Sequence, residues 1–237
     1  MKFVPLALFF ASVPLCFFVP LRIARERLIR EYGVLAAVAA IWGCRDAFLA
    51  VEWFRGLYPW AWHIFYGHAF PDACHFALDA ALSLACFQQM GRRTKDLFPT
   101  GLIILLATCA LVGVFVTWMV PTPGLFTRDF QVIRYGRAWC GTFLALSLAF
   151  FSRRFTSIGT PSSAAFDQAG IACVLFVGTF IANTLASMKG LAERQAGGIL
   201  LELVCVGCFA GWSLLLTAER ERSGGEPLRQ AARAMGA

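Results

Sequence analysis

Seven apolar stretches, each about as long as a membrane-spanning helix, constrain the fold of this chain more than any other feature. A transmembrane helix needs about 20 mainly apolar residues to cross the hydrocarbon core. The stretches lie at residues 3–20, 33–54, 61–88, 99–120, 131–152, 165–187 and 197–218. Charged residues make up only 15% of the chain, against about 25% in soluble domains, which argues against a water-soluble core. The sequence predicts an all-α bundle of seven transmembrane helices, with residues 1–218 as one domain and 219–237 as a short polar tail.

The first stretch has an alternative interpretation as a cleaved signal peptide, because it begins with Lys2 and an apolar run. No small-x-small cleavage site follows it. Four arginines come directly after it, between Arg22 and Arg30, as in a stop-transfer flank. We therefore expect a retained helix.

The basic residues between the stretches predict the orientation, because Lys and Arg favour the cytoplasmic side of a membrane. With the N-terminus outside, the inner segments hold thirteen basic residues and the outer segments hold seven. The sequence therefore predicts a multi-pass protein of the cell (inner) membrane, with its C-terminus in the cytoplasm.

Ionisable side chains inside the third stretch are the main candidate site. His68, Asp72, His75 and Asp79 are spaced by four, three and four residues, which places them on one face of a helix. Ionisable groups in hydrocarbon are costly, so they usually face the bundle interior and often mark function.

Further polar residues on the other stretches are expected near the same depth. They are Arg45, Asp46 and Glu52 on the second stretch, Arg134 and Arg137 on the fifth, Asn183 on the sixth and Glu202 on the seventh. In the predicted topology Arg45 and Asp46 lie near the middle of their helix, and the others lie in the extracytoplasmic half of the bundle. The sequence therefore predicts a polar core there.

Three interpretations of this core remain open. The first is a structural network in which buried charges neutralise one another, with Arg45 paired to an acid on the third stretch. The second is a pocket for a small molecule or ion, open to the outside. The third is a metal site, in which Glu52 or Glu202 completes a set of ligands from the third stretch.

Several chemistries lack the residues that they need. None of the three lysines lies in the last stretch, where a retinal protein holds its cofactor. All three histidines lie in one stretch, which does not supply a facing haem pair. Neither hydrolase nor phosphate-binding motifs are present. The nine cysteines show no disulfide framework, and Cys205-x-x-Cys208 is interpreted as packing inside an apolar helix. No cofactor is favoured, the metal stays unknown, and the scattered arginines do not form a nucleic-acid surface.

The layout resembles uncharacterised small bacterial membrane proteins with seven helices. The resemblance rests on the segments from Arg22 to Tyr32 and from Phe65 to Arg93, the second of which includes Phe76 and Asp79. The chain departs from the pattern at 69–72, where Ala-Phe-Pro-Asp replaces an expected Tyr/Trp cluster. The resemblance implies the fold and no activity.

We expect a non-enzymatic membrane protein, either a sensor-like module or the membrane subunit of a complex. Its partners are the lipid bilayer and other membrane subunits or a signalling protein. In this hypothesis His68, Asp72 and His75 form the polar core, and histidine makes its state pH-sensitive. The alternatives are a small transporter or proton-coupled carrier, and a metal- or haem-binding redox protein.

Overall fold

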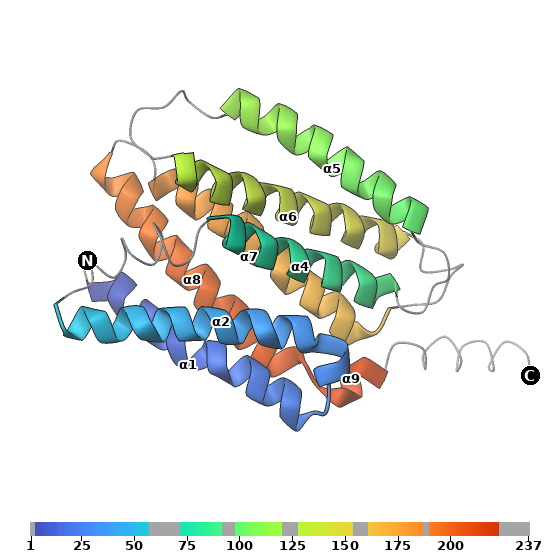
Figure 1. Ribbon diagram of the computed structural model, residues 1–237, viewed down its shortest axis with the longest axis horizontal. Coiled ribbons are helices and arrows are strands. Elements are labelled where there is room, and N and C mark those ends of the chain that lie inside the picture. The colour runs from blue at the N-terminus through green and yellow to red at the C-terminus, as the bar shows by residue number, and fades with distance from the viewer. Residues whose placement is uncertain are drawn as a thin grey trace, which may run out of the picture.

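The computed structural model describes residues 3–56, 72–91, 98–119, 128–153, 161–186 and 190–222. Across these ranges the chain is all-helical, with eight helices and no strand (Figure 1). They are α1 (Phe3–Arg25), α2 (Ile29–Phe54), α4 (Asp72–Gly91), α5 (Phe98–Met119), α6 (Arg128–Arg153), α7 (Ser163–Ala186), α8 (Leu191–Leu215) and α9 (Ala218–Arg222). The all-α prediction is confirmed, and each apolar stretch contains one long helix. Residues 61–71 of the third stretch lie outside the described residues.

Four helices of the described chain are long and apolar enough to cross a membrane: α1, α2, α7 and α8. Helix α5 has a shorter apolar segment, Pro99–Val112. The chain therefore has the helices of a membrane protein, and the three further crossings stay a prediction.

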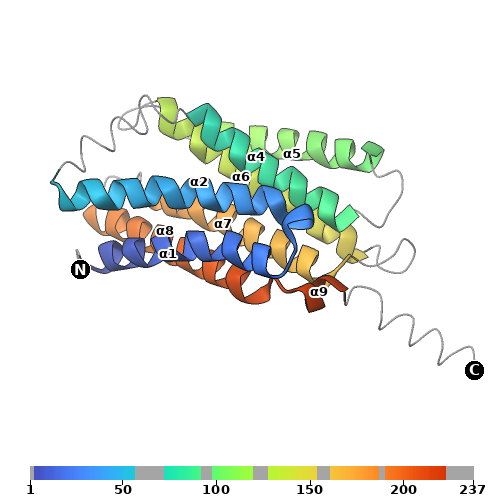
Figure 2. The same ribbon diagram turned by 60° about the horizontal axis from the view of Figure 1, so that its bottom comes forward.

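The long helices form one bundle in which α1, α4, α6 and α8 run in one direction and α2, α5 and α7 in the other (Figures 1 and 2). Helix α1 packs against α2 and α8, α2 also packs against α4, and α4 packs against α6 and α7. Helix α7 lies between α6 and α8 and completes the ring. Helix α5 packs on the outer side of α6. Five helices (α2, α4, α6, α7 and α8) thus surround a common interior.

Helix α2 shows how the sequence turns polar residues inward. Its buried positions recur every three or four residues, which is the period of one helix face: Tyr32, Leu35, Ala39, Trp42, Asp46 and Leu49. Because Asp46 continues the apolar series, it faces the bundle with Trp42 one turn away. Exposed Ile41 and Phe48 lie on the opposite side, as expected for a helix in lipid.

Small residues let α6, α7 and α8 approach closely, which is the usual way that membrane helices pack. A Cβ on Gly141 of α6 would lie 2.8 Å from Val177 Cγ2 of α7, and one on Gly178 would lie 2.8 Å from Val204 Cγ2 of α8. Near the start of α8, a Cβ on Gly197 would lie 2.5 Å from the backbone nitrogen of Ala186. The backbone itself therefore forms this contact between α7 and α8.

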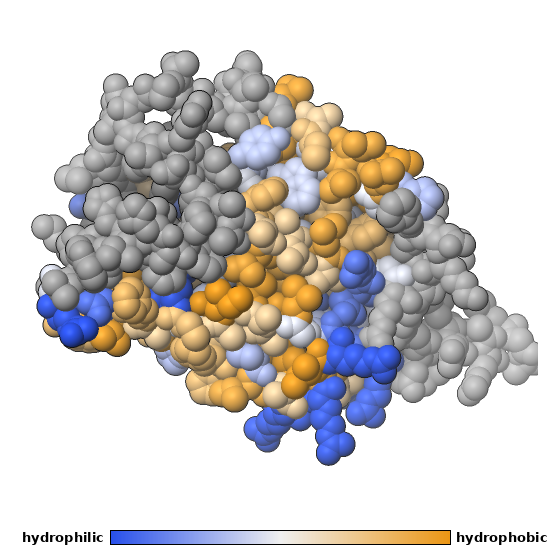
Figure 3. Space-filling view, in the orientation of Figure 1, coloured by the Kyte–Doolittle hydropathy of each residue, from blue (hydrophilic) through white to orange (hydrophobic). Residues whose placement is uncertain are grey.

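A tight turn joins α1 to α2 at the end of the bundle where α9 lies. Leu28 N–H donates to Ile23 C=O at 2.9 Å and Arg27 N–H to Ala24 C=O at 3.1 Å, which is the Schellman pattern of a helix C-terminus. Arg27 has φ of 59°, in the left-handed region that usually selects glycine. Arg25, Arg27 and Arg30 are exposed around the turn. Hydrophilic side chains gather at this end in Figure 3, beside an apolar middle.

Adjacent glycines of α8 offer a matched test of this packing. Gly197→Ala should lower the free energy of unfolding by about 1–3 kcal/mol, because the new Cβ meets the backbone of α7. Gly198→Ala is the control, since its Cβ has nothing within 4 Å and alanine favours a helix by about 1 kcal/mol. Thermal unfolding in one detergent measures both. Equal stability of the two variants would show that α7 and α8 do not meet at Gly197.

Candidate functional site

Two arginine–carboxylate pairs inside the ring form what we call the polar centre: Arg45, Asp46, Asp79 and Arg137. On α2, Arg45 Nε and Nη2 both lie 2.7 Å from Asp46 Oδ1. Between α4 and α6, Arg137 Nε lies 3.8 Å from Asp79 Oδ2. The two carboxylates are buried, and each arginine side chain is 17% exposed. Each buried charge therefore has an opposite charge beside it, as burial requires.

The polar centre lies in the half of the bundle opposite α9. Asp79 is on the third turn of α4 and Arg137 on the third turn of α6, counted from the ends at Asp72 and Arg128. Arg45 is about as far from the end of α2 at Phe54, so all three lie about 10–15 Å from the same end of the bundle. In the predicted topology this end is extracytoplasmic.

A cavity of about 30 Å³ lies within the polar centre. Its wall adds Trp42 of α2, Thr179 of α7 and Cys205 of α8 to the four charged residues, and apolar side chains close it. A water molecule needs about 10–15 Å³ of such space. The cavity is therefore of the size of water and not of an organic substrate.

Two polar atoms of the cavity wall have unused hydrogen-bonding capacity. Asp79 Oδ1 and Trp42 Nε1 are buried, and neither has a hydrogen-bond partner among the described residues. Asp79 is 2% exposed and Trp42 is 7% exposed. An unpaired acceptor and an unpaired donor beside one small cavity are the groups that a buried water molecule commonly joins.

Glu202, near the middle of α8, adds a third carboxylate to this region. Its carboxyl group interacts electrostatically with Asp46 and Arg45, and also with Cys205 on the same helix. It makes no ion pair with any residue whose side chain the structure describes. The region thus contains two described guanidiniums and three carboxyl groups.

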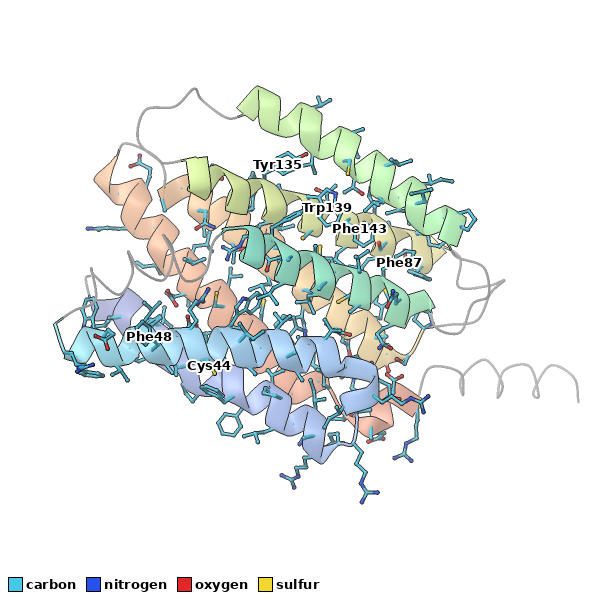
Figure 4. The ribbon with its side chains drawn as sticks, in the orientation of Figure 1. Cys44, Phe48, Phe87, Tyr135, Trp139 and Phe143 are labelled. Carbon is cyan, nitrogen blue, oxygen red and sulfur yellow. The ribbon has the colours of Figure 1, made fainter. Side chains whose placement is uncertain are left out.

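Mainly apolar side chains fill the bundle between the polar centre and the end at α9, and the hydroxyls of buried Ser83 and Ser147 donate to the backbone of their own helices. On α4, the residues that follow Asp79 on its face are Leu82, Cys86 and Met90, all at most 1% exposed. Phe87 of α4 lies 5.7 Å from Phe143 of α6, measured between ring centroids, and Phe143 stacks on Trp139 (Figure 4). We call these residues the apolar plug.

Two other residues predicted for the polar core lie beyond the centre, toward the same end of the bundle. Glu52 is 5% exposed and lies 3.0 Å from Arg55 Nη1, three residues along the same helix. Asn183 is buried on α7, one turn beyond Thr179. The structure therefore brings Arg45, Asp46, Asp79 and Arg137 together and places Glu52 and Asn183 farther out.

Four predicted residues cannot be placed in the centre. His68 lies outside the described residues. Asp72 and His75 lie on the first turns of α4 and Arg134 on α6, but their side chains are outside the described part of the structure. Among the described residues, no three His, Cys, Asp or Glu side chains come together as a metal site requires. The contribution of these four residues to the polar core stays a prediction.

Sequence reasoning missed the cavity wall and a second polar cluster at the other end of the bundle. Nothing in the sequence marks Trp42, Thr179 and Cys205 as cavity residues, because each is typical of an apolar helix. The second cluster holds α9, and Glu221 is its centre: Glu221 Oε2 accepts hydrogen bonds from the hydroxyls of Tyr32 on α2 and Ser162 before α7. Ser162 Oγ also caps α7 by accepting from Ala165 N–H at 3.1 Å, and a serine directly before an apolar run is a recognisable N-cap signal.

Two further contacts complete this cluster, which we call the α9 anchor. Arg220 Nη2 lies 2.8 Å from Asp167 Oδ2 of α7, and Ala218 N–H donates to Glu26 Oε2 of α1 at 3.0 Å. Helix α9 is therefore held to α1, α2 and the start of α7 at once.

No known protein family matches the chain, and neither curated proteins nor solved structures show a significant similarity to it.

The Arg45–Asp46 pair can be tested with a double-mutant cycle. Arg45→Gln should lower the free energy of unfolding by about 3–5 kcal/mol, because it leaves a buried carboxylate without its countercharge. Adding Asp46→Asn should recover part of the loss, since the stranded charge is removed. Arg25→Gln, at an exposed helix end, is the control and should cost at most about 1 kcal/mol. Strictly additive losses in the cycle would contradict the pair.

Proposed function

We propose that the chain is a non-enzymatic protein that crosses the cell membrane seven times and acts as a sensor-like module or as the membrane subunit of a complex. In this proposal the N-terminus is outside and the C-terminus is cytoplasmic. The exposed arginines around the α1–α2 turn, at the same end as α9, support this orientation.

The observation that carries the proposal is the small size of the cavity in the polar centre. Its cavity of about 30 Å³ is too small for an organic substrate, and the apolar plug lies between it and the other end of the bundle. Two larger hollows, of about 460 Å³ and 420 Å³, share no wall residue with this cavity. A charged core whose cavity has only the size of water supports a protein that changes state or binds neighbours over one that binds an organic solute.

The α9 anchor supports a sensor-like role over a purely structural one. Helices α2 and α7 carry residues of the polar centre's wall in one half and contacts of α9 in the other. A shift of either helix that follows a change in the centre therefore acts directly on the segment leading to the C-terminal tail. Coupling of this kind needs one element in contact with both sites.

The first alternative is a small carrier, which needs water access to the centre from both sides and usually a broken helix near the midplane. Pro71 is the sequence feature that favours it, and this residue lies outside the described part. The second alternative, a metal- or haem-binding redox protein, depends on His68 and His75, which no described contact brings to the centre.

Flux measurements separate the main proposal from a carrier. Purified protein in liposomes with an internal pH dye should dissipate a proton gradient no faster than liposomes without protein, because the apolar plug interrupts the polar path. Each sample is checked for insertion by protease accessibility. A proton flux that is present in the wild type and lost in Asp79→Asn would overturn the proposal in favour of the carrier.

A complex subunit should also be found with its partner. Extraction of native membranes in a mild detergent should yield the chain in an assembly of defined stoichiometry with a second protein. Arg137→Gln should weaken the assembly by altering the polar centre, whereas Arg25→Gln should leave it intact. A chain that is monodisperse and alone in every mild detergent, without cross-links to another protein in the membrane, would argue against this role.

A further inference from the structure

The carboxyl groups around the polar centre outnumber its described cations. Arg45 is committed to Asp46 through two contacts at 2.7 Å, and Arg137 lies beside Asp79. Each of these pairs is neutral. Glu202 makes no ion pair with a described side chain. It lies one turn before Cys205, a wall residue of the cavity, on the same face of α8, and it interacts electrostatically with both Asp46 and Arg45.

We propose that Glu202 is a proton-binding site, which holds one exchangeable proton as a neutral carboxylic acid at neutral pH. An ionised carboxylate near the middle of a membrane helix is costly unless a cation compensates it. A bound proton removes that cost without a new ion pair. Asp46 and Asp79 differ from Glu202 in that each has a guanidinium beside it.

The elements packed around Glu202 supply no other described countercharge. Helix α1, which packs against α8, has no charged residue between Phe3 and Leu21. Helix α7 contributes the uncharged Thr179 and Asn183 on its buried face. The described charges that face this region are Arg45 and Asp46 of α2 and Arg137 of α6. Arg137 interacts electrostatically with Cys205, one turn along α8 from Glu202.

Asp79 shows how loosely the second ion pair of the centre is compensated. Asp79 Oδ1, in a side chain 2% exposed, lines the cavity with no hydrogen-bond partner among the described residues. The cation of its ion pair lies 3.8 Å from its other oxygen. The described side chains of the centre therefore offer no spare cation for an ionised Glu202.

Release of the proton would change the centre in a defined way, and this step rests on the proposed sensor-like function. The O–H bond of Glu202 breaks, the electron pair stays on the carboxylate, and the proton passes to water. The new negative charge then competes with Asp46 for Arg45. The Arg45–Asp46 pair is thus the element that responds to the proton on Glu202.

Infrared spectroscopy of the purified full chain tests the assignment directly. The wild type at neutral pH should show the C=O stretching band of a protonated carboxyl group, shifted in D₂O. The band should be lost in Glu202→Gln and kept in Asp79→Asn and in Glu193→Gln, whose exposed residue lies near the start of the same helix. Because glutamine mimics a neutral glutamic acid, Glu202→Gln should also unfold at the wild-type temperature.

Isotope labelling makes the test independent of whether a variant folds. In wild-type protein, carboxyl-¹³C glutamate should shift the band and carboxyl-¹³C aspartate should not. Absence of the band, a shift with labelled aspartate, or survival of the band in Glu202→Gln would each overturn the assignment. None of these measurements involves a partner or a flux, so their failure is distinct from failure of the proposed function.

Discussion

The neutralisation of charge inside a low-dielectric bundle is the constraint on which the rest of this structure depends. A single buried carboxylate or guanidinium without a partner costs several kcal/mol, so Arg45 needs Asp46 and Arg137 needs Asp79 beside it. The second pair constrains the relative rotation of α4 and α6, because each helix has to turn one of its two residues toward the other, whereas the first pair is completed within α2. Apolar packing alone gives weaker guidance, since lipid tails are as apolar as leucine side chains.

Small residues and charge pairs act at different positions along the bundle. Close contacts at Gly141, Gly178 and Gly197 hold α6, α7 and α8 through their backbones. The polar centre lies on the inner side of these helices, and the α9 anchor fixes the opposite end. The apolar plug lies between the two polar clusters. Among the described residues, the bundle therefore has two polar sites that α2 and α7 connect.

The sequence predicted the helices well because a long apolar run is a direct consequence of the bilayer's thickness. The spacing of residues on the third stretch also placed Asp79 on the inner face, where the structure has it. The partner of Arg45 was harder to predict. Neighbouring residues do not face each other on a helix, so an acid on another helix was expected, whereas the long arginine side chain pairs with the adjacent Asp46. The α9 anchor joins Tyr32 to Glu221 across most of the chain, and no local pattern encodes such a contact.

The direction of polarity around the centre bears on the side of the membrane from which water reaches it. From Asp46 and Thr179 toward the nearer end of the bundle, polar residues continue with Glu52 and Asn183. In the other direction the same face of α4 carries Leu82, Cys86 and Met90, with Ser83 as a buried polar residue whose hydroxyl donates to Asp79 C=O. If Glu202 exchanges a proton, water on the near side is therefore the source. One-sided access of this kind is expected of a sensor, because a carrier has to expose the same carboxyl group to both compartments in turn.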